Sequence, residues 1–200
     1  MTSHAIEPMR RPWAEAVSVW RYGGEYEMYS FDGSEVCVQE LLDGGYYAWL
    51  NKEGRPEGYF CFGPPAQIPT REEGVYPAGP LDIGLGMAPE LCGIGQGGAF
   101  LEDGLKFARE RFGARDLRLT VASFNKRAIR VYQRAGFAAV REAAHKRSGM
   151  AFTVMVTNSD RVTLADRCKL QLPSPLRMPR AVTAWTASSS SMRRRVRFSG

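Results

Sequence analysis

One stretch of the chain could hold a phosphate group because it is dense in glycine and comes directly before an apolar-periodic segment. Glycine is needed where the backbone takes a positive φ or approaches a ligand closely, and unpaired amides at a helix N-terminus attract anions. The glycines and their position before a helical segment therefore predict a site where backbone amides bind an anion. Its residues are Gly93, Ile94, Gly95, Gln96, Gly97 and Gly98.

Three interpretations of this turn compete. A P-loop ends in Gly-Lys-Ser/Thr, whereas the chain continues Gly97-Gly98-Ala99, which excludes that motif. The dinucleotide pattern Gly-x-Gly-x-x-Gly matches weakly, because the preceding strand ends near Met87 and Asp116 comes at the wrong end of the next strand. A glycine-rich turn without a ligand stays open if the turn is taken alone.

The segments around the turn predict a mixture of strands and helices. Leu81 to Met87 alternate apolar residues with Asp82, Gly84 and Gly86, a period of two that is typical of a strand with one nearly bare face. Helical spacing follows the glycines and ends at Gly113, and Asn125 is a natural cap for a second helix. The expected strands are 46–50, 58–62, 81–87, 117–121, 137–144 and 150–156.

The net charge of +6 is concentrated near the end of the chain. From Asn158 onward nine Lys or Arg face two Asp, so the preceding body is close to neutral, which disfavours nucleic acid as a partner of the body. We expect a folded domain over residues 1–157 and a basic, disordered tail over 158–200, with a polybasic arm for RNA as the tail's alternative function.

Other composition features narrow the class of protein. The scattered cysteines, Cys37, Cys61, Cys92 and Cys168, and the distant His4 and His145 predict neither a disulfide framework nor a metal site. No apolar run is long enough to span a bilayer, so we expect no membrane partner and a cytoplasmic location.

The order of these features resembles the GNAT acetyltransferase superfamily. Its loop Gln/Arg-x-x-Gly-x-Gly/Ala is similar to Cys92–Gly97, and its Asn…Tyr…Gly-Phe pattern is similar to Asn125, Tyr132 and Gly136-Phe137. The resemblance covers roughly Trp13 to Val156 and looks closest to a bacterial branch. It implies an α/β (α+β) fold in which a mixed central sheet has antiparallel N-terminal strands, a cofactor strand-loop-helix and flanking helices.

The resemblance also implies a function, which is transfer of an acetyl group from acetyl-CoA to a primary amine of a small molecule or protein by direct attack on the thioester. The family places the CoA pyrophosphate on Gly93–Gly98 and the pantetheine arm along Leu85, Gly86 and Met87, whose backbone N–H groups suit the oxyanion. Asn125 would combine helix capping with a CoA contact. Tyr132 would be the general acid that protonates the departing thiolate.

Two departures from the family pattern matter. Cys92 stands where Gln or Arg is usual, so the phosphates would depend on backbone amides, helped by Lys126 or Arg130. Thr120 stands where protein N-terminal acetyltransferases have a glutamate, and it cannot act as a base. Asp82 is then the best candidate base, with a salt-bridged strand residue as its alternative.

Several alternatives remain open in the sequence. Glu25 is a weaker second candidate for the base. The aromatic residues Trp20, Tyr22, Tyr26 and Tyr29 could line an acceptor pocket or simply form core. A catalytically silent acyl-CoA-binding or sensing module is the alternative function, and a homodimer is an open alternative to a monomer.

Overall fold

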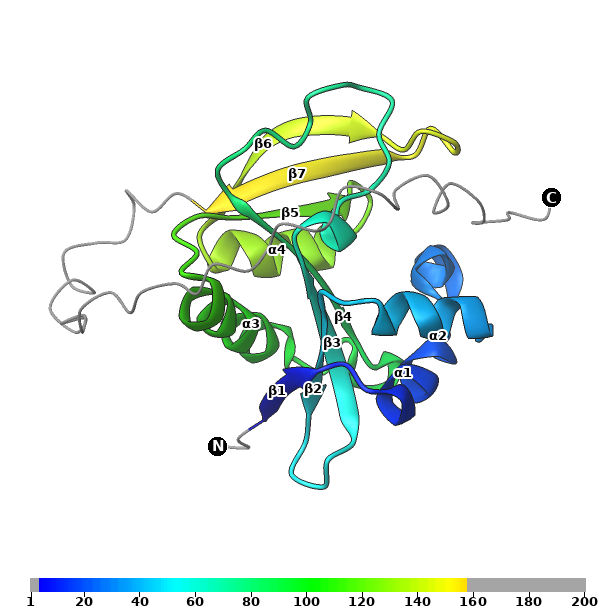
Figure 1. The fold of residues 1–200 in the computed structure, drawn as a ribbon. Helices are drawn as coiled ribbons and strands as arrows, with labels where there is room; N and C mark the ends of the chain where they lie inside the picture. Colours follow the sequence, from blue (N-terminus) through cyan, green and yellow to red (C-terminus); the bar gives the residue numbers. More distant parts are fainter. Residues whose placement is uncertain (1–3, 158–200) are drawn as a thin grey trace, which may run out of the picture. The chain divides into compact units, whose positions relative to one another are not determined.

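Seven strands form one mixed sheet, in the order β1-β2-β3-β4-β5-β7-β6, in the computed structural model of the chain (Figure 1). The structure describes residues 4–157, all within the first of two units, Met1–Thr163 and Leu164–Gly200. The expected basic tail over 158–200, and Cys168 in it, lie outside the described residues. The strands are β1 Ala5–Pro8, β2 Tyr46–Leu50, β3 Pro56–Phe62, β4 Leu81–Met87, β5 Leu117–Ala122, β6 Phe137–Ala144 and β7 Ala151–Thr157.

The sheet consists of two antiparallel halves joined by one parallel pair. Strands β1 to β4 pair antiparallel in chain order, and β7 pairs antiparallel with both β5 and β6. The parallel pair is β4 with β5, and the chain crosses between them through α3. This topology confirms the expected mixed sheet with antiparallel N-terminal strands.

The helices begin and end where local chemistry satisfies their free backbone groups. The Ser34 side chain accepts a hydrogen bond from the amide of Cys37 and caps α2, and Asn125 caps α4 in the same way. Gly113 ends α3 in the left-handed conformation at φ 64°. The helices are α1 Arg11–Ser18, α2 Glu35–Leu42, α3 Gly97–Phe112 and α4 Lys126–Arg134, with 3-10 turns η1 Gly24–Tyr29, η2 Pro64–Ala66 and η3 Pro89–Leu91.

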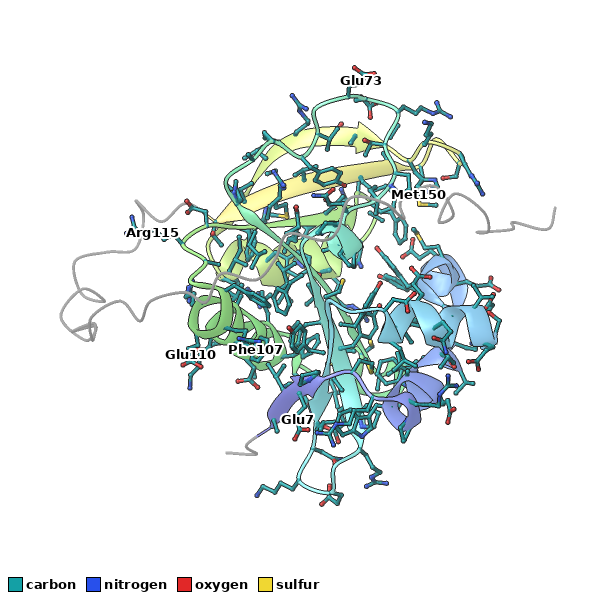
Figure 2. All side chains as sticks on the ribbon, in the orientation of Figure 1. Glu7, Glu73, Phe107, Glu110, Arg115 and Met150 are labelled. Atoms are coloured by element: carbon teal, nitrogen blue, oxygen red, sulfur yellow. The ribbon has the colours of Figure 1, made fainter. Side chains whose placement is uncertain are left out.

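Helices cover both faces of the first half of the sheet. Figure 1 shows α3 on one side of β3 and β4, with α1 and α2 on the other. Apolar residues of α3 such as Leu101 and Leu105 pack on Trp49 and Phe60 in the main core, which buries large side chains worth roughly 1.5–3 kcal/mol each. Phe107 lies on the sheet-facing side of this helix and Glu110 on its outer side (Figure 2).

A long segment covers part of the second half of the sheet. Residues 63–80, teal in Figure 1, pass over β6 and β7. The Arg71 amide donates to Ala144 O, the Lys146 amide donates to Pro69 O, and Val75 is buried with Ala143. This Pro- and Gly-rich segment is therefore packed on the sheet.

The N-terminal region holds elements that the sequence patterns did not predict, namely β1, α1, η1 and α2. Within residues 4–157, no helix is long and apolar enough to cross a membrane.

Candidate active site

Strands β4 and β5 separate soon after they pair. The ladder joins only Leu81 with Leu117 and Asp82 with Arg118, although β4 continues to Met87. The Leu81 amide donates to Asp116 O, so the odd-numbered residues of β4 direct their backbone groups toward β5. We term the two paired positions the joint between β4 and β5. Beyond this joint, the backbone groups of Leu85 and Met87 therefore have no partner on a neighbouring strand among the described residues.

A cavity of about 820 Å³ occupies the space where the strands separate. It extends from the start of α3 and one face of α4 to the tyrosines around η1. Its wall includes residues from β3, β4, β5 and the glycine turn. The lining brings together almost all of the predicted site residues, namely Leu85, Gly86, Met87, Gly93, Gly95, Gly97, Gly98, Asn125 and Tyr132.

The glycine turn presents free backbone amides to this cavity. Gly93 and Gly95 have φ of 88° and 91°, a conformation that other residues adopt rarely. Gln96 makes no side-chain cap to α3, and the first turn of that helix carries no acidic residue. The amides of the first turn are therefore available to an anion. Gln96 and the exposed Ile94 belong to the turn but do not line the cavity.

A guanidinium group lies next to the turn. Arg127, from the first turn of α4, lines the cavity and places Nη1 3.3 Å from the position that a Cβ on Gly93 would occupy. Its Cζ lies 5.0 Å from the centre of the Tyr26 ring, in a cation–π contact. Lys126 and Arg130, which the sequence suggested as helpers, do not line the cavity. The absence of Lys and Arg from the glycine turn indicates in the sequence that a cation for the phosphates must come from another element. It does not indicate that this cation is Arg127.

Asn125 performs the capping role expected of it. Its Oδ1 accepts a hydrogen bond from the Ala128 amide at 3.1 Å, and the residue also lines the cavity.

Two tyrosines of the cavity wall, Tyr29 and Tyr132, lie close to each other. Burial raises the pKa of Tyr132 well above the ordinary value, and the nearby Tyr29 raises it further. The Tyr29 hydroxyl is buried beside Asn125 and the Ala122 backbone but forms no hydrogen bond of good geometry within the described residues. Burial raises the pKa of Tyr29 as well, so both phenols are neutral proton donors at physiological pH.

Asp82 occupies a different environment from the one that a base requires. Its Oδ1 lies 2.6 Å from Nε of Arg118, and its Oδ2 accepts from Arg118 Nη2 at 2.8 Å and from Gln67 Nε2 at 2.7 Å. Asp82 is 5% exposed, Arg118 is 3% exposed, and neither lines the cavity. The geometry corresponds to the salt-bridged alternative, and Arg118 also donates to Pro77 O at 2.8 Å.

The face of β4 that carries Gly84 and Gly86 is not bare, which corrects the expectation from the sequence. A Cβ at Gly86 would overlap the Tyr59 ring, and one at Gly84 would overlap the Cys61 sulfur. These glycines make room for side chains of β3. The backbone that stays accessible is the β5-facing edge of the strand.

The aromatic residues near η1 divide into two groups. Tyr22, Tyr26 and Tyr29 line the cavity, whereas Trp20 packs against the α1–α2 core. The Tyr22 hydroxyl donates to Met87 O at 2.8 Å. Tyr59 also lines the cavity, and the sequence gave no signal for it because it lies inside an ordinary strand pattern.

Two further features concern the chemistry available to the site. The Cys92 thiol donates to Met87 O at 3.6 Å, and burial raises its pKa, which keeps it a thiol. Among residues 4–157, no group of three or more His, Cys, Asp or Glu could hold a metal ion.

The chain also matches a known family over most of its described length. The sequence profile described as the acetyltransferase (GNAT) family matches residues 11–137. That match spans more than half of the chain, so the protein belongs to the GNAT acetyltransferase family and is an acyltransferase. No curated protein sequence matches the chain significantly.

Solved structures share the fold at low sequence identity. A GNAT-family acetyltransferase from Bacillus anthracis has a TM-score of 0.60 at 13% identity, covering 80% of this chain and 99% of that one. An aminoglycoside N(6')acetyltransferase from Legionella pneumophila scores 0.57 at 19% identity, covering 80% and 94%. A chimera of the Vibrio cholerae spermidine N-acetyltransferase SpeG scores 0.57 at 15% identity, covering 79% and 96%.

Proposed function

We propose that the protein is an acetyl-CoA-dependent N-acetyltransferase that acetylates a primary amine by direct attack on the thioester. The observation that supports this most strongly is the single cavity in which the glycine turn, the unpaired edge of β4 and Tyr132 meet. We assign the activity to residues 1–157.

The residues of the cavity suit acetyl-CoA. Positive-φ glycines at 93 and 95 and the uncapped start of α3 form a cradle for a pyrophosphate, and Arg127 supplies the cation that the loop lacks. Leu85 and Met87 offer backbone groups to an extended arm. Acetyl-CoA itself supplies the activated acetyl group.

Each reacting group then has one task. The Met87 region of β4 presents backbone N–H to the oxygen on which negative charge develops. Tyr132 keeps its proton and donates it to the leaving sulfur. Asp82 is left out of this set because both carboxylate oxygens already accept N–H donors. Glu25, the second candidate base, is exposed and does not line the cavity, so the acceptor amine loses its proton to solvent.

Calorimetric titration with acetyl-CoA, followed by a thiol-release assay with a panel of amines, tests the proposal. We expect saturable binding and amine-dependent CoA release. Binding without turnover for every amine would favour the acyl-CoA-binding module instead, and absence of binding would refute both.

A further inference from the structure

The amine acceptor must share the cavity with the thioester, and residues around η1 form part of the cavity wall. Figure 1 shows α3 opposite α1 and α2 across β3 and β4. Four tyrosines also line the cavity, namely Tyr22, Tyr26 and Tyr29 in and next to η1 and Tyr59 on β3, and we term them the tyrosine wall. This step rests on the proposed function.

The tyrosine wall is held in place by its neighbours. The Tyr22 hydroxyl donates a hydrogen bond to the carbonyl oxygen of Met87, a residue next to the proposed reaction centre. The rings of Tyr26 and Tyr29 lie 5.8 and 6.5 Å from that of Phe124. Tyr59 contacts three further rings, those of Trp20, Phe31 and Tyr46. Such a preformed wall favours flat, apolar groups that contact ring faces and edges.

The charges of the lining point the same way. One carboxylate, Glu102, lines the cavity, and it is an exposed residue of α3. Three guanidinium groups line it as well, those of Arg109, Arg127 and Arg134. Glu90 is close enough to raise the pKa of Tyr22, after burial and Cys92, but it does not line the cavity. Glu25 and Glu27 of η1 are exposed and do not line the cavity either, so a second ammonium inside the cavity would lose water without gaining a counter-charge from the wall around η1.

We infer that the acceptor is a primary monoamine on an aromatic or apolar body, not a polycation such as a polyamine or an aminoglycoside. The tyrosine wall supplies the contact area for such a body.

The test compares acceptors on the full-length protein with saturating acetyl-CoA. Phenethylamine and tyramine represent aromatic monoamines, hexylamine an aliphatic one, and spermidine and kanamycin polycations. We expect kcat/KM for phenethylamine to exceed that for spermidine and kanamycin by about 100-fold or more. Calorimetric binding of phenethylamine to the CoA-saturated protein gives a second readout that does not depend on turnover.

A wall variant tests the role of the aromatic rings. Tyr26→Leu removes one ring, and we expect the ratio of kcat/KM for phenethylamine to that for hexylamine to fall about tenfold. This ratio is measured on one preparation, so partial unfolding or weakened acetyl-CoA binding, which affect both amines equally, cannot imitate the effect. An unchanged ratio would contradict a contact between Tyr26 and the acceptor.

The failures of the two proposals are distinguishable. Spermidine or kanamycin reacting as well as phenethylamine would overturn the acceptor inference and leave the acetyltransferase standing. Acetyl-CoA binding without reaction of phenethylamine, tyramine or hexylamine would also overturn it. Failure to bind acetyl-CoA at all would remove the proposed function on which the inference rests.

Discussion

Tyr132 is the residue on which the proposed chemistry depends most directly. Tyr132→Phe keeps the ring contact with Phe137 and removes only the hydroxyl. We expect kcat to fall about 100-fold with little change in acetyl-CoA affinity, because the hydroxyl acts on the leaving thiolate. Thiol-release kinetics and calorimetry on the same samples measure the two effects, and an unchanged kcat would remove Tyr132 from the mechanism.

The raised pKa of Tyr132 also predicts a pH profile. An ordinary tyrosine ionises near pH 10, and burial raises this pKa, so the phenol keeps its proton to higher pH. We expect kcat to rise as the acceptor amine deprotonates and not to fall again below about pH 10. A descending limb near neutral pH would show that a different group is the acid.

The role of Arg127 in binding acetyl-CoA can be tested by comparing it with another arginine of the same helix, α4. Arg127→Ala removes the guanidinium beside Gly93, and we expect acetyl-CoA to bind about 10- to 100-fold more weakly, as for a lost hydrogen bond to a charged group. Arg130→Ala is the matched control, because Arg130 is an exposed arginine of α4 that does not line the cavity. Equal affinities of the two variants would mean that Arg127 does not contact the phosphates.

At the scale of single elements, α3 packs against β3 through a glycine. A Cβ at Gly104 would overlap the Phe60 ring, which is fully buried. Alanine normally stabilises a helix interior by about 0.5–1 kcal/mol relative to glycine. Here we expect Gly104→Ala to lower the free energy of unfolding by about 1–3 kcal/mol instead.

Urea unfolding of Gly104→Ala and of Gly98→Ala in parallel checks this expectation. Gly98 lies in the same helix and has open space around its Cβ position, so its substitution should be neutral or stabilising. Destabilisation of both variants by the same amount would contradict the packing explanation.

The element scale also shows what a sequence can predict. The strand from Leu81, the glycine turn and the helix from Asn125 are local patterns of periodicity, turn and cap, and the structure has them where they were expected. The pairing of Asp82 with Arg118 joins residues 36 positions apart, and no local pattern contains it. Arg127 and Arg130 lie on the same helix, and only Arg127 lines the cavity. This difference depends on how α4 packs in the fold, which the local sequence does not show.

The ion pair between Asp82 and Arg118 connects three elements, since it joins β4 to β5 and holds the 63–80 segment through Gln67 and Pro77. Asp82→Asn leaves a buried guanidinium without its counter-charge. We expect the free energy of unfolding to drop by about 3–5 kcal/mol. The double variant Asp82→Leu/Arg118→Met should recover much of this loss, and a denaturation series on both variants measures it.

For the whole molecule, the number of buried tyrosines predicts how stability changes at alkaline pH. Burial raises the pKa of Tyr22, Tyr29, Tyr46, Tyr59 and Tyr132. Above about pH 10 the unfolded chain releases these protons while the folded chain retains them, so the unfolded state gains stability. The stabilising contribution of these protonated tyrosines to the free energy of unfolding is complete below about pH 10 and is lost as the pH rises above it.

Urea unfolding at intervals from about pH 8 to about pH 11 follows this loss, and absorbance of tyrosinate reports ionisation in parallel. We expect the midpoint to fall steeply only above about pH 10, together with tyrosinate formation. A midpoint that stays constant to about pH 11 would contradict the prediction.

The two-position joint between β4 and β5 also bears on how the chain folds. Strands β2 and β3 pair across residues 51–55 and β3 and β4 across residues 63–80, whereas residues 88–116, which include α3, separate β4 from β5 in the chain. Loop-closure entropy delays such nonlocal pairing. We expect the β2–β3–β4 meander to form early and the joint late, so that the crevice between the strands takes shape in the last step of folding.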